Sequence, residues 1–248
     1  MPTDEAARAG QELFWLRVTA AAIDVVALAI IAQAAAVALY AASGGMLRST
    51  TFARAAHCQP MSRLSPALMK GVAVPAGARP VAAQMCVISS LGLETGRYVL
   101  VALQSQNGEV VRSLAFTRPV DRKGAPVTPV ILDWVWPLAF IAAMSLGEAL
   151  TGATIGKRLV GLTVTDGSSR RPGLARTLGR NLVIWGGAAL VLIAPLAAAL
   201  MKLPVSQPLY WGAVVLFGLL VLAPIAMLIQ QPARPLYDRW AGTAVVRR

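Results

Sequence analysis

The sequence has few charged residues for its length. They make up 14% of the 248 residues, whereas a soluble globular domain carries roughly 25%. Hydrophobic residues make up 56%, and the mean hydropathy is +0.62. This composition excludes an ordinary soluble domain and predicts an integral membrane protein with some extramembrane material.

Residues that could perform catalysis or bind metal are also scarce. The one histidine, His57, and the two cysteines, Cys58 and Cys86, all lie in one polar segment. No Ser/His/Asp set is evident, so we predict no enzyme activity, no catalytic residue and no cofactor. The spacing of the three residues does not suit zinc, so no metal site is predicted. A Cys58–Cys86 disulfide would close a loop of about 27 residues and stabilise a small domain by roughly 3 kcal/mol, although free buried cysteine is the common alternative.

Acidic residues are the third deficit. The chain has 11 Asp and Glu against 23 Lys and Arg, a formal net charge of +12. Such an excess occurs in nucleic-acid-binding proteins, but no nucleic-acid module is recognisable. Many of the positive residues flank apolar runs, where they set membrane orientation. We therefore expect the lipid bilayer, and no nucleic acid, as a partner.

Four apolar runs are long enough to cross a bilayer: residues 18–42, 130–150, 182–201 and 210–229. The first run is too long for a signal peptide and contains an acid. Six positive residues lie in the connector 151–180 and four in the tail from 230, against one in the link 202–209. The positive-inside rule then predicts a multi-pass protein of the inner (plasma) membrane, with both termini cytoplasmic and residues 43–129 outside.

The insertion at 43–129 has the pattern of a small β-rich domain. Residues 97–103 and 110–116 alternate as strands do, and Gln106-Asn107-Gly108-Glu109 between them contains the strongest short hairpin signal. Residues 68–74 and 81–93 are weaker strand candidates. The pattern predicts a sandwich-type domain, on the side where a disulfide can persist.

Two charged residues in the first apolar run are unusual for a simple anchor. Arg17 opens the run and Asp24 lies seven residues later, almost two helical turns, so both side chains share one face about 10 Å apart along the axis. A buried aspartate in a membrane helix costs about 2.5–3.5 kcal/mol on insertion scales. Asp24 could carry a proton or cation, with Arg17 as its partner, or could serve only to hold helices together.

The connector after the second run begins with a glycine-rich motif, Gly152-Ala153-Thr154-Ile155-Gly156-Lys157-Arg158. A phosphate-binding loop needs four residues between its glycines and a hydroxyl residue after the lysine, so the nucleotide interpretation fails. A basic pair at a re-entrant segment suits anionic headgroups instead. The residues expected at the membrane surface are Lys157, Arg158, Arg180 and Arg239.

Several motifs together resemble the RDD family of bacterial membrane proteins. The resemblance rests on Arg17 and Asp24, on Gly152 through Val164, on Arg180-Asn181-Leu182, and on Asp238-Arg239-Trp240-Ala241-Gly242-Thr243-Ala244-Val245-Val246. It covers all but the insertion, which the family's core does not explain. The resemblance implies a membrane-embedded helical core, and transport of unidentified ligands or cation/proton exchange has been suggested for members.

We thus predict an all-α transmembrane bundle of four helices with an inserted β-rich extracytoplasmic domain between helices 1 and 2. The expected domains are residues 1–42, 43–129 and 130–248. The predicted substrate- or ion-binding cluster comprises Arg17, Asp24, Glu148 and Asp238.

Three classes of function remain open at this stage. A transporter would move a monovalent cation or proton and, with few spans, would need to form a homo-oligomer. An accessory or assembly protein would use the β domain to bind a membrane partner protein. A sensor would use the same domain to bind a ligand.

Overall fold

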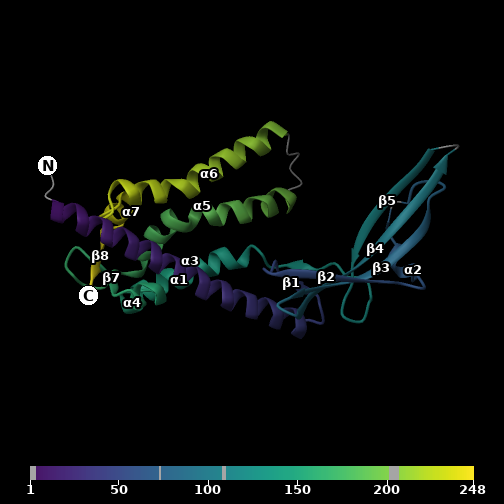
Figure 1. Ribbon diagram of the computed structural model, residues 1–248, viewed down its shortest axis with the longest axis horizontal. Helices are drawn as coiled ribbons and strands as arrows, with labels where there is room; N and C mark the ends of the chain where they lie inside the picture. Colours follow the sequence, from purple (N-terminus) through teal and green to yellow (C-terminus); the bar gives the residue numbers. More distant parts are fainter. Residues whose placement is uncertain (1–3, 73, 108–109, 201–206) are drawn as a thin grey trace. The chain divides into compact units, whose positions relative to one another are not determined.

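The computed structural model describes residues 4–72, 74–107, 110–200 and 207–248, which form two compact units (Figure 1). The first unit contains residues 1–30 and 134–248, and the second contains residues 31–133. The boundary therefore lies within the first helix, so that residues 31–42 belong with the insertion rather than with the first expected domain.

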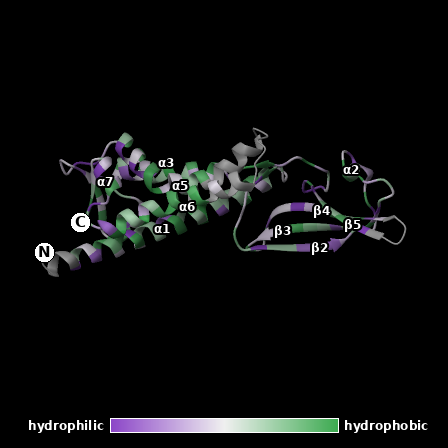
Figure 2. Cartoon of the chain, turned by 90° about the horizontal axis from the view of Figure 1, so that it is seen from above, coloured by the Kyte–Doolittle hydropathy of each residue, from purple (hydrophilic) through white to green (hydrophobic). Residues whose placement is uncertain are grey.

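The first unit is mainly helical, with one small sheet. Its elements are α1 (Asp4–Ala42), α3 (Val135–Thr151), α4 (Ile155–Leu159), β7 (Leu162–Asp166), α5 (Leu174–Leu200), α6 (Gln207–Gln230), α7 (Leu236–Trp240) and β8 (Thr243–Arg247). Figure 2 shows hydrophobic residues along α1, α5 and α6. Many of these residues are exposed, including Val26, Ile30 and Leu219.

The predicted all-α bundle of four transmembrane helices is wrong. The chain is about 47% helix and 27% strand, with several sheets. Over the described residues, one helix is long and apolar enough to cross a membrane, Arg8–Ala42, while Val135–Thr151 and Gly218–Gln230 are shorter apolar helices. The second apolar run loses length because residues 130–131 form a strand instead of helix.

The segments on both sides of the helices also differ from the prediction. The helix α5 begins at Leu174, inside the expected connector, and Pro224 lies within α6. Met201, the expected end of the third span, and residues 202–206 of the expected link lie outside the described residues.

The connector and the tail together form an antiparallel pair of strands, β7 with β8, in which Leu162 lies opposite Arg247. Leu162, Val164 and Val245 pack with Ala20 of α1 in a small core.

The second unit is built on a four-stranded antiparallel sheet in the order β2-β3-β4-β5. The strands are β2 (Arg54–Pro60), β3 (Arg79–Ser90), β4 (Leu93–Asn107) and β5 (Val110–Pro119). A separate two-stranded parallel sheet pairs β1 (Leu47–Arg48) with β6 (Val130–Ile131). The predicted hairpin of β4 and β5 is confirmed, with Asn107 opposite Val110; residues 108–109 of its expected turn lie outside the described residues.

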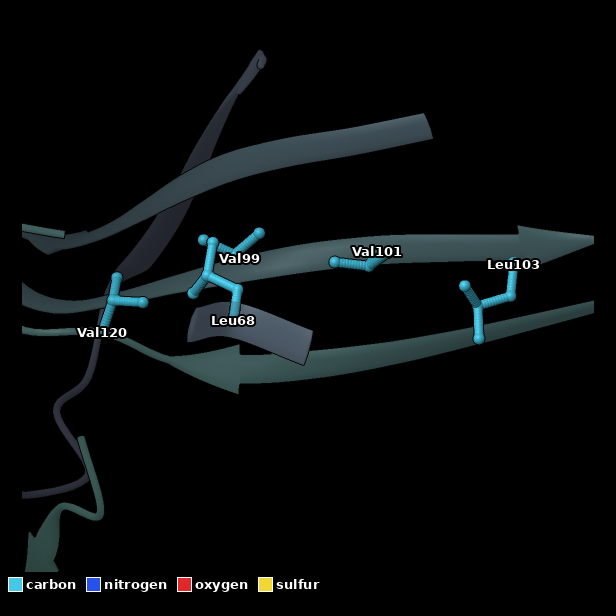
Figure 3. Packing of buried hydrophobic residues seen from close by; sticks show 5 residues of the cluster. All are labelled: Leu68, Val99, Val101, Leu103 and Val120. Atoms are coloured by element: carbon cyan, nitrogen blue, oxygen red, sulfur yellow. The ribbon is translucent and has the colours of Figure 1, made fainter. Parts of the chain in front are cut away.

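The expected sandwich and one expected strand are wrong. The four-stranded sheet is a single layer, and its core lies on one face, where the buried cluster comprises Leu68, Val99, Val101, Leu103 and Val120 (Figure 3). Leu68 belongs to a short helix, α2 (Pro66–Met69), in place of the predicted strand 68–74. Proline at the first helical position favours this start, since its missing N–H would be unpaired there in any case.

Two features tie the second unit together. The Cys58–Cys86 disulfide, confirmed with a Cα separation of 4.0 Å, joins β2 to β3 at directly opposed positions. The end of α1 is bound to the sheet by hydrogen bonds, from Gln33 to the Ser90 hydroxyl at 2.6 Å and from Tyr40 to the Glu94 carboxylate at 2.7 Å. The last turns of α1 are thus part of this unit.

Candidate functional site

The candidate site is a buried charge network in the first unit, with Arg180 of α5 at its centre. The Arg180 guanidinium donates from Nε to Asp238 at 2.5 Å and from Nη1 to Glu148 at 2.6 Å. It also lies over the ring of Tyr237, 5.8 Å from the centroid. One side chain therefore bridges a carboxylate of α3 and a carboxylate of α7.

Arg17 of α1 joins the network at Asp238. Its Nη1 donates to the second carboxylate oxygen of Asp238 at 2.7 Å, and its Nη2 donates to the Ala233 carbonyl at 3.0 Å. Asp238 is fully buried and Arg17 is 7% exposed. The contact joins positions 221 residues apart in the chain, so it fastens the first helix to the C-terminal part of the unit.

Glu148 of α3 is held on both of its oxygens. Lys157 of α4 donates to the same oxygen that Arg180 contacts, and Asn181 donates to the other at 3.2 Å. Glu148 and Asn181 are both buried. Together Arg17, Lys157, Arg180, Glu148 and Asp238 connect five helices, and these five residues are called the charge network below.

Asp24 lies on the same buried face of α1 as Arg17 but has different partners. Its two oxygens accept hydrogen bonds from the Thr154 hydroxyl at 2.5 Å and from the Gly156 backbone N–H at 2.7 Å. Thr154 is the N-cap of α4, and Gly156 follows in its first turn. Asp24 thus caps α4 from outside, where free N–H groups and the helix dipole favour a negative charge.

Gly156 permits this contact because it has no side chain. A Cβ there would lie 2.0 Å from the Ala20 carbonyl oxygen and 3.0 Å from Cγ of Asp24. Any other residue would push α4 away from α1. The glycine of the sequence motif is therefore explained by close helix packing and not by a bound phosphate.

The network keeps its carboxylates charged despite their burial. Burial alone would raise the pKa of Asp238, but the guanidinium groups of Arg180 and Arg17 outweigh it and hold that pKa below its ordinary value. At Lys157, burial lowers the pKa and Glu148 opposes the effect. Ionised acids and bases in matched positions make the network a set of fixed ion pairs near neutral pH.

The structure brings the four predicted ion-binding residues into one region but pairs them differently. Arg17 binds Asp238 rather than Asp24, and Asp24 binds α4. Among the residues expected at the membrane surface, Lys157 and Arg180 instead have their side chains against Glu148, whereas Arg158 and Arg239 are exposed.

Sequence reasoning missed the central position of Arg180 and the roles of Thr154 and Gly156. Arg180 follows five other basic residues in a connector whose charge predicts a surface segment, so the composition did not indicate its burial. Thr154 did carry a signal, because a threonine before an apolar residue and a short basic run is a typical N-cap. No feature of the sequence indicated the contact of Asn181 with Glu148.

A cavity of about 290 Å³ adjoins Asp24, and its lining includes Leu28, Met144, Thr151 and Arg158. Its walls are mostly apolar, and the polar residues in them are Asp24, Thr151, Thr154 and Arg158. Within the described parts of the chain, Asp24 has no basic group at ion-pair distance.

Over the described residues the first unit has one apolar helix long enough to cross a membrane and shorter apolar helices, which the charge network joins. The chain belongs to the RDD family: the family model matches residues 113–242, more than half of the chain. The match includes Glu148, Lys157, Arg180 and Asp238 but begins inside β5 and does not reach back to Arg17 and Asp24. It is thus shorter at the N-terminal end than the resemblance implied. Neither a curated protein nor a solved structure matches the chain.

Proposed function

We propose that this RDD-family protein is a membrane-anchored binding protein. In this proposal the charge network locks the helical unit together, and the β unit binds a ligand or partner protein on the outer side of the membrane. The single observation that carries it is the pairing within the network, because both of its carboxylates have two basic partners each.

The pairing argues against the network as an ion path. A carboxylate that carries a proton or cation has to release its partners in each cycle. Breaking a buried, hydrogen-bonded ion pair costs about 3–5 kcal/mol, and Glu148 and Asp238 would each have to leave two such pairs. A fixed structural role has no such cost.

The proposed topology follows from the same contacts and from the charge count. α1 crosses the membrane once, with Arg17 at the cytoplasmic border and residues 43–129 outside. If this contact region of Glu148 and Asp238 with Arg180 and Arg17 is cytoplasmic, as we propose, the chain returns across the membrane through the apolar helices that follow the insertion. The tail and the connector, rich in Lys and Arg, then lie where the positive-inside rule expects them.

The β unit has properties that suit an external binding domain. Its disulfide requires an oxidising compartment to persist. All seven residues of β2 are exposed, and this strand forms one edge of the four-stranded sheet. An exposed edge offers unpaired backbone groups, which can add a strand from a partner.

A second candidate function is carriage of a proton or monovalent cation by Asp24. It is supported by the cavity of about 290 Å³ beside this carboxylate and by the lack of a basic partner for Asp24 in the described residues. A transporter of this kind would move the ion past α4 and leave the charge network intact.

One experiment separates the two candidates: proton and sodium flux into proteoliposomes containing the full chain, with Asp24→Asn as the variant and Glu12→Gln as a matched control on the same helix. Glu12 is 56% exposed, so its charge is removed without disturbing the core. The binding-protein proposal expects no flux above empty liposomes for all three proteins. It also expects a lower melting temperature for Asp24→Asn alone, because an amide N–H₂ would face the Gly156 N–H or the Thr154 hydroxyl. Flux by the wild type that Asp24→Asn abolishes, with folding retained, would favour the carrier and overturn the first proposal.

A further inference from the structure

A second and larger cavity, of about 850 Å³, lies in the first unit at the turn between β7 and α5, beside α7. It is separate in its lining from the cavity at Asp24. Its walls include three arginines, Arg176, Arg234 and Arg239, together with Trp240 and the Asp166-Gly167-Ser168 turn. The function proposed above makes no use of it.

The charges around this cavity do not cancel. Asp166 is the acid in its lining, and that carboxylate already accepts hydrogen bonds from Ser168 N–H, the Ser168 hydroxyl and Arg170 N–H, at 2.8–2.9 Å. Its other oxygen pairs with Arg176 at 3.6 Å. In the part of the chain that the structure describes, Arg234 and Arg239 form no ion pair. The cavity therefore has about two positive charges without a protein counter-charge.

The kind of charge and its neighbours indicate the ligand. Guanidinium groups are planar, remain protonated, and bind phosphate oxygens through two parallel hydrogen bonds. Trp240 stands beside them with 67% of its surface exposed, and exposed tryptophan is typical of the headgroup level of a membrane.

We propose that this cavity binds a phosphate-bearing anion through Arg234 and Arg239. The phosphate could belong to an anionic phospholipid headgroup or to a soluble phosphate ester, and both would place their oxygens between the two guanidinium groups. The inference does not depend on whether the charge network is a lock or Asp24 is a carrier, because it uses neither group.

The test uses the full chain in detergent micelles, with two arms. In the first arm, native mass spectrometry counts phosphatidylglycerol bound in competition with phosphatidylcholine. In the second, calorimetric titration measures binding of glycerol 3-phosphate and of inorganic phosphate. The variant is Arg234→Gln/Arg239→Gln, and the matched control is Arg170→Gln/Arg248→Gln, which removes the same charge from exposed positions outside the lining. Thermal unfolding checks that both proteins are folded.

The proposal expects at least one of the probes to bind to the wild type and to the control, and to bind about tenfold or more weakly to the Arg234/Arg239 variant, since charge-assisted hydrogen bonds are lost. Binding of phosphatidylglycerol alone assigns the site to lipid, and binding of the soluble phosphates assigns it to a free ester. Equal weakening in the variant and the control would reveal nonspecific charge attraction and overturn the proposal. Absence of binding in both arms would also overturn it.

Discussion

At the residue scale, Arg180 is the position on which the charge network most depends, because among the described residues its side chain alone pairs with both Glu148 and Asp238. Its loss leaves two buried carboxylates short of a partner. We expect Arg180→Gln to lower the free energy of unfolding by about 3–5 kcal/mol, measured by thermal or denaturant unfolding in detergent. Arg170→Gln, which removes an exposed charge, is expected to change it by under about 0.5 kcal/mol. Equal stability of the two variants would contradict a structural role for the network.

Asp238 gives the network a dependence on pH. Its pKa in the folded protein lies below the ordinary value, so its contribution to stability is complete above the unfolded pKa of about 3.9 and is lost as the pH falls through the lower folded value. We expect the melting temperature to drop on acidification in that range. Asp238→Asn is expected to start from a lower melting temperature and to show a smaller acid-induced drop. An unchanged slope in the variant would assign the acid sensitivity to other carboxylates.

Gly156 tests the close approach of α4 to α1. An added methyl group would meet the Ala20 carbonyl at 2.0 Å, a separation that no rotamer change relieves, because both atoms belong to rigid positions. We expect Gly156→Ala to lower the melting temperature strongly and to weaken the Asp24 contacts. Gly173→Ala is the control, since a Cβ there has no neighbour within 4 Å, and it is expected to have little effect. A Gly156→Ala protein as stable as the control would show that the two helices can separate at low cost.

At the scale of elements, the disulfide is the main covalent tie of the β unit. It links β2, an edge strand with every residue exposed, to β3, so β2 has little packing of its own to hold it. Reduction, or the pair of changes Cys58→Ser and Cys86→Ser, is expected to lower the stability of this unit by roughly 3 kcal/mol in the chain-entropy model. Limited proteolysis with and without reductant measures it, with cleavage expected within or next to β2. If both cysteines of the non-reduced protein reacted with an alkylating reagent as free thiols, the result would contradict the Cys58–Cys86 disulfide.

The elements also show where sequence patterns sufficed and where they did not. The β4–β5 hairpin followed from alternation and an Asn-Gly pair, and the disulfide pairing followed from there being two cysteines. The sandwich did not follow, because alternation says that one face of a strand is buried but not whether a second sheet or a short helix such as α2 covers it. The helical core was over-predicted for a related reason: hydropathy counts apolar residues but does not detect that residues 130–131 pair with β1.

The sequence predicted which residues lie in the candidate site better than it predicted which of them form ion pairs with one another. Arg17, Asp24, Glu148 and Asp238 were chosen because acids and bases in apolar surroundings need partners, and all four are buried in the same unit. Their partners could not be deduced, since the contact of Arg17 with Asp238 spans 221 residues and depends on how the helices pack. Arg180 and Lys157 looked like surface charges for the same reason.

At the scale of the whole molecule, the topology is the property most open to a direct test. We expect single cysteines in a Cys58→Ser/Cys86→Ser background, placed as Met46→Cys and Lys123→Cys, to react with a membrane-impermeant maleimide added to intact cells. Arg170→Cys, in the connector, is expected to react only after permeabilisation. Met46 and Lys123, the two positions expected outside, are both well exposed, so access is not limited by burial. Reversed labelling would contradict the proposed orientation and, with it, an external β unit.

The contact between Arg17 and Asp238 also has a consequence for biogenesis. A ribosome adds about 5–20 residues per second, so the 221 residues between these positions take on the order of 10–45 s to synthesise. In the proposed topology, the first helix is in the membrane during that interval, with an arginine whose final partner does not yet exist. Lipid headgroups can hold its charge meanwhile, since a long basic side chain reaches the interface. The charge network therefore remains incomplete until α7 has been made, and up to that moment Arg17 lacks its carboxylate partner.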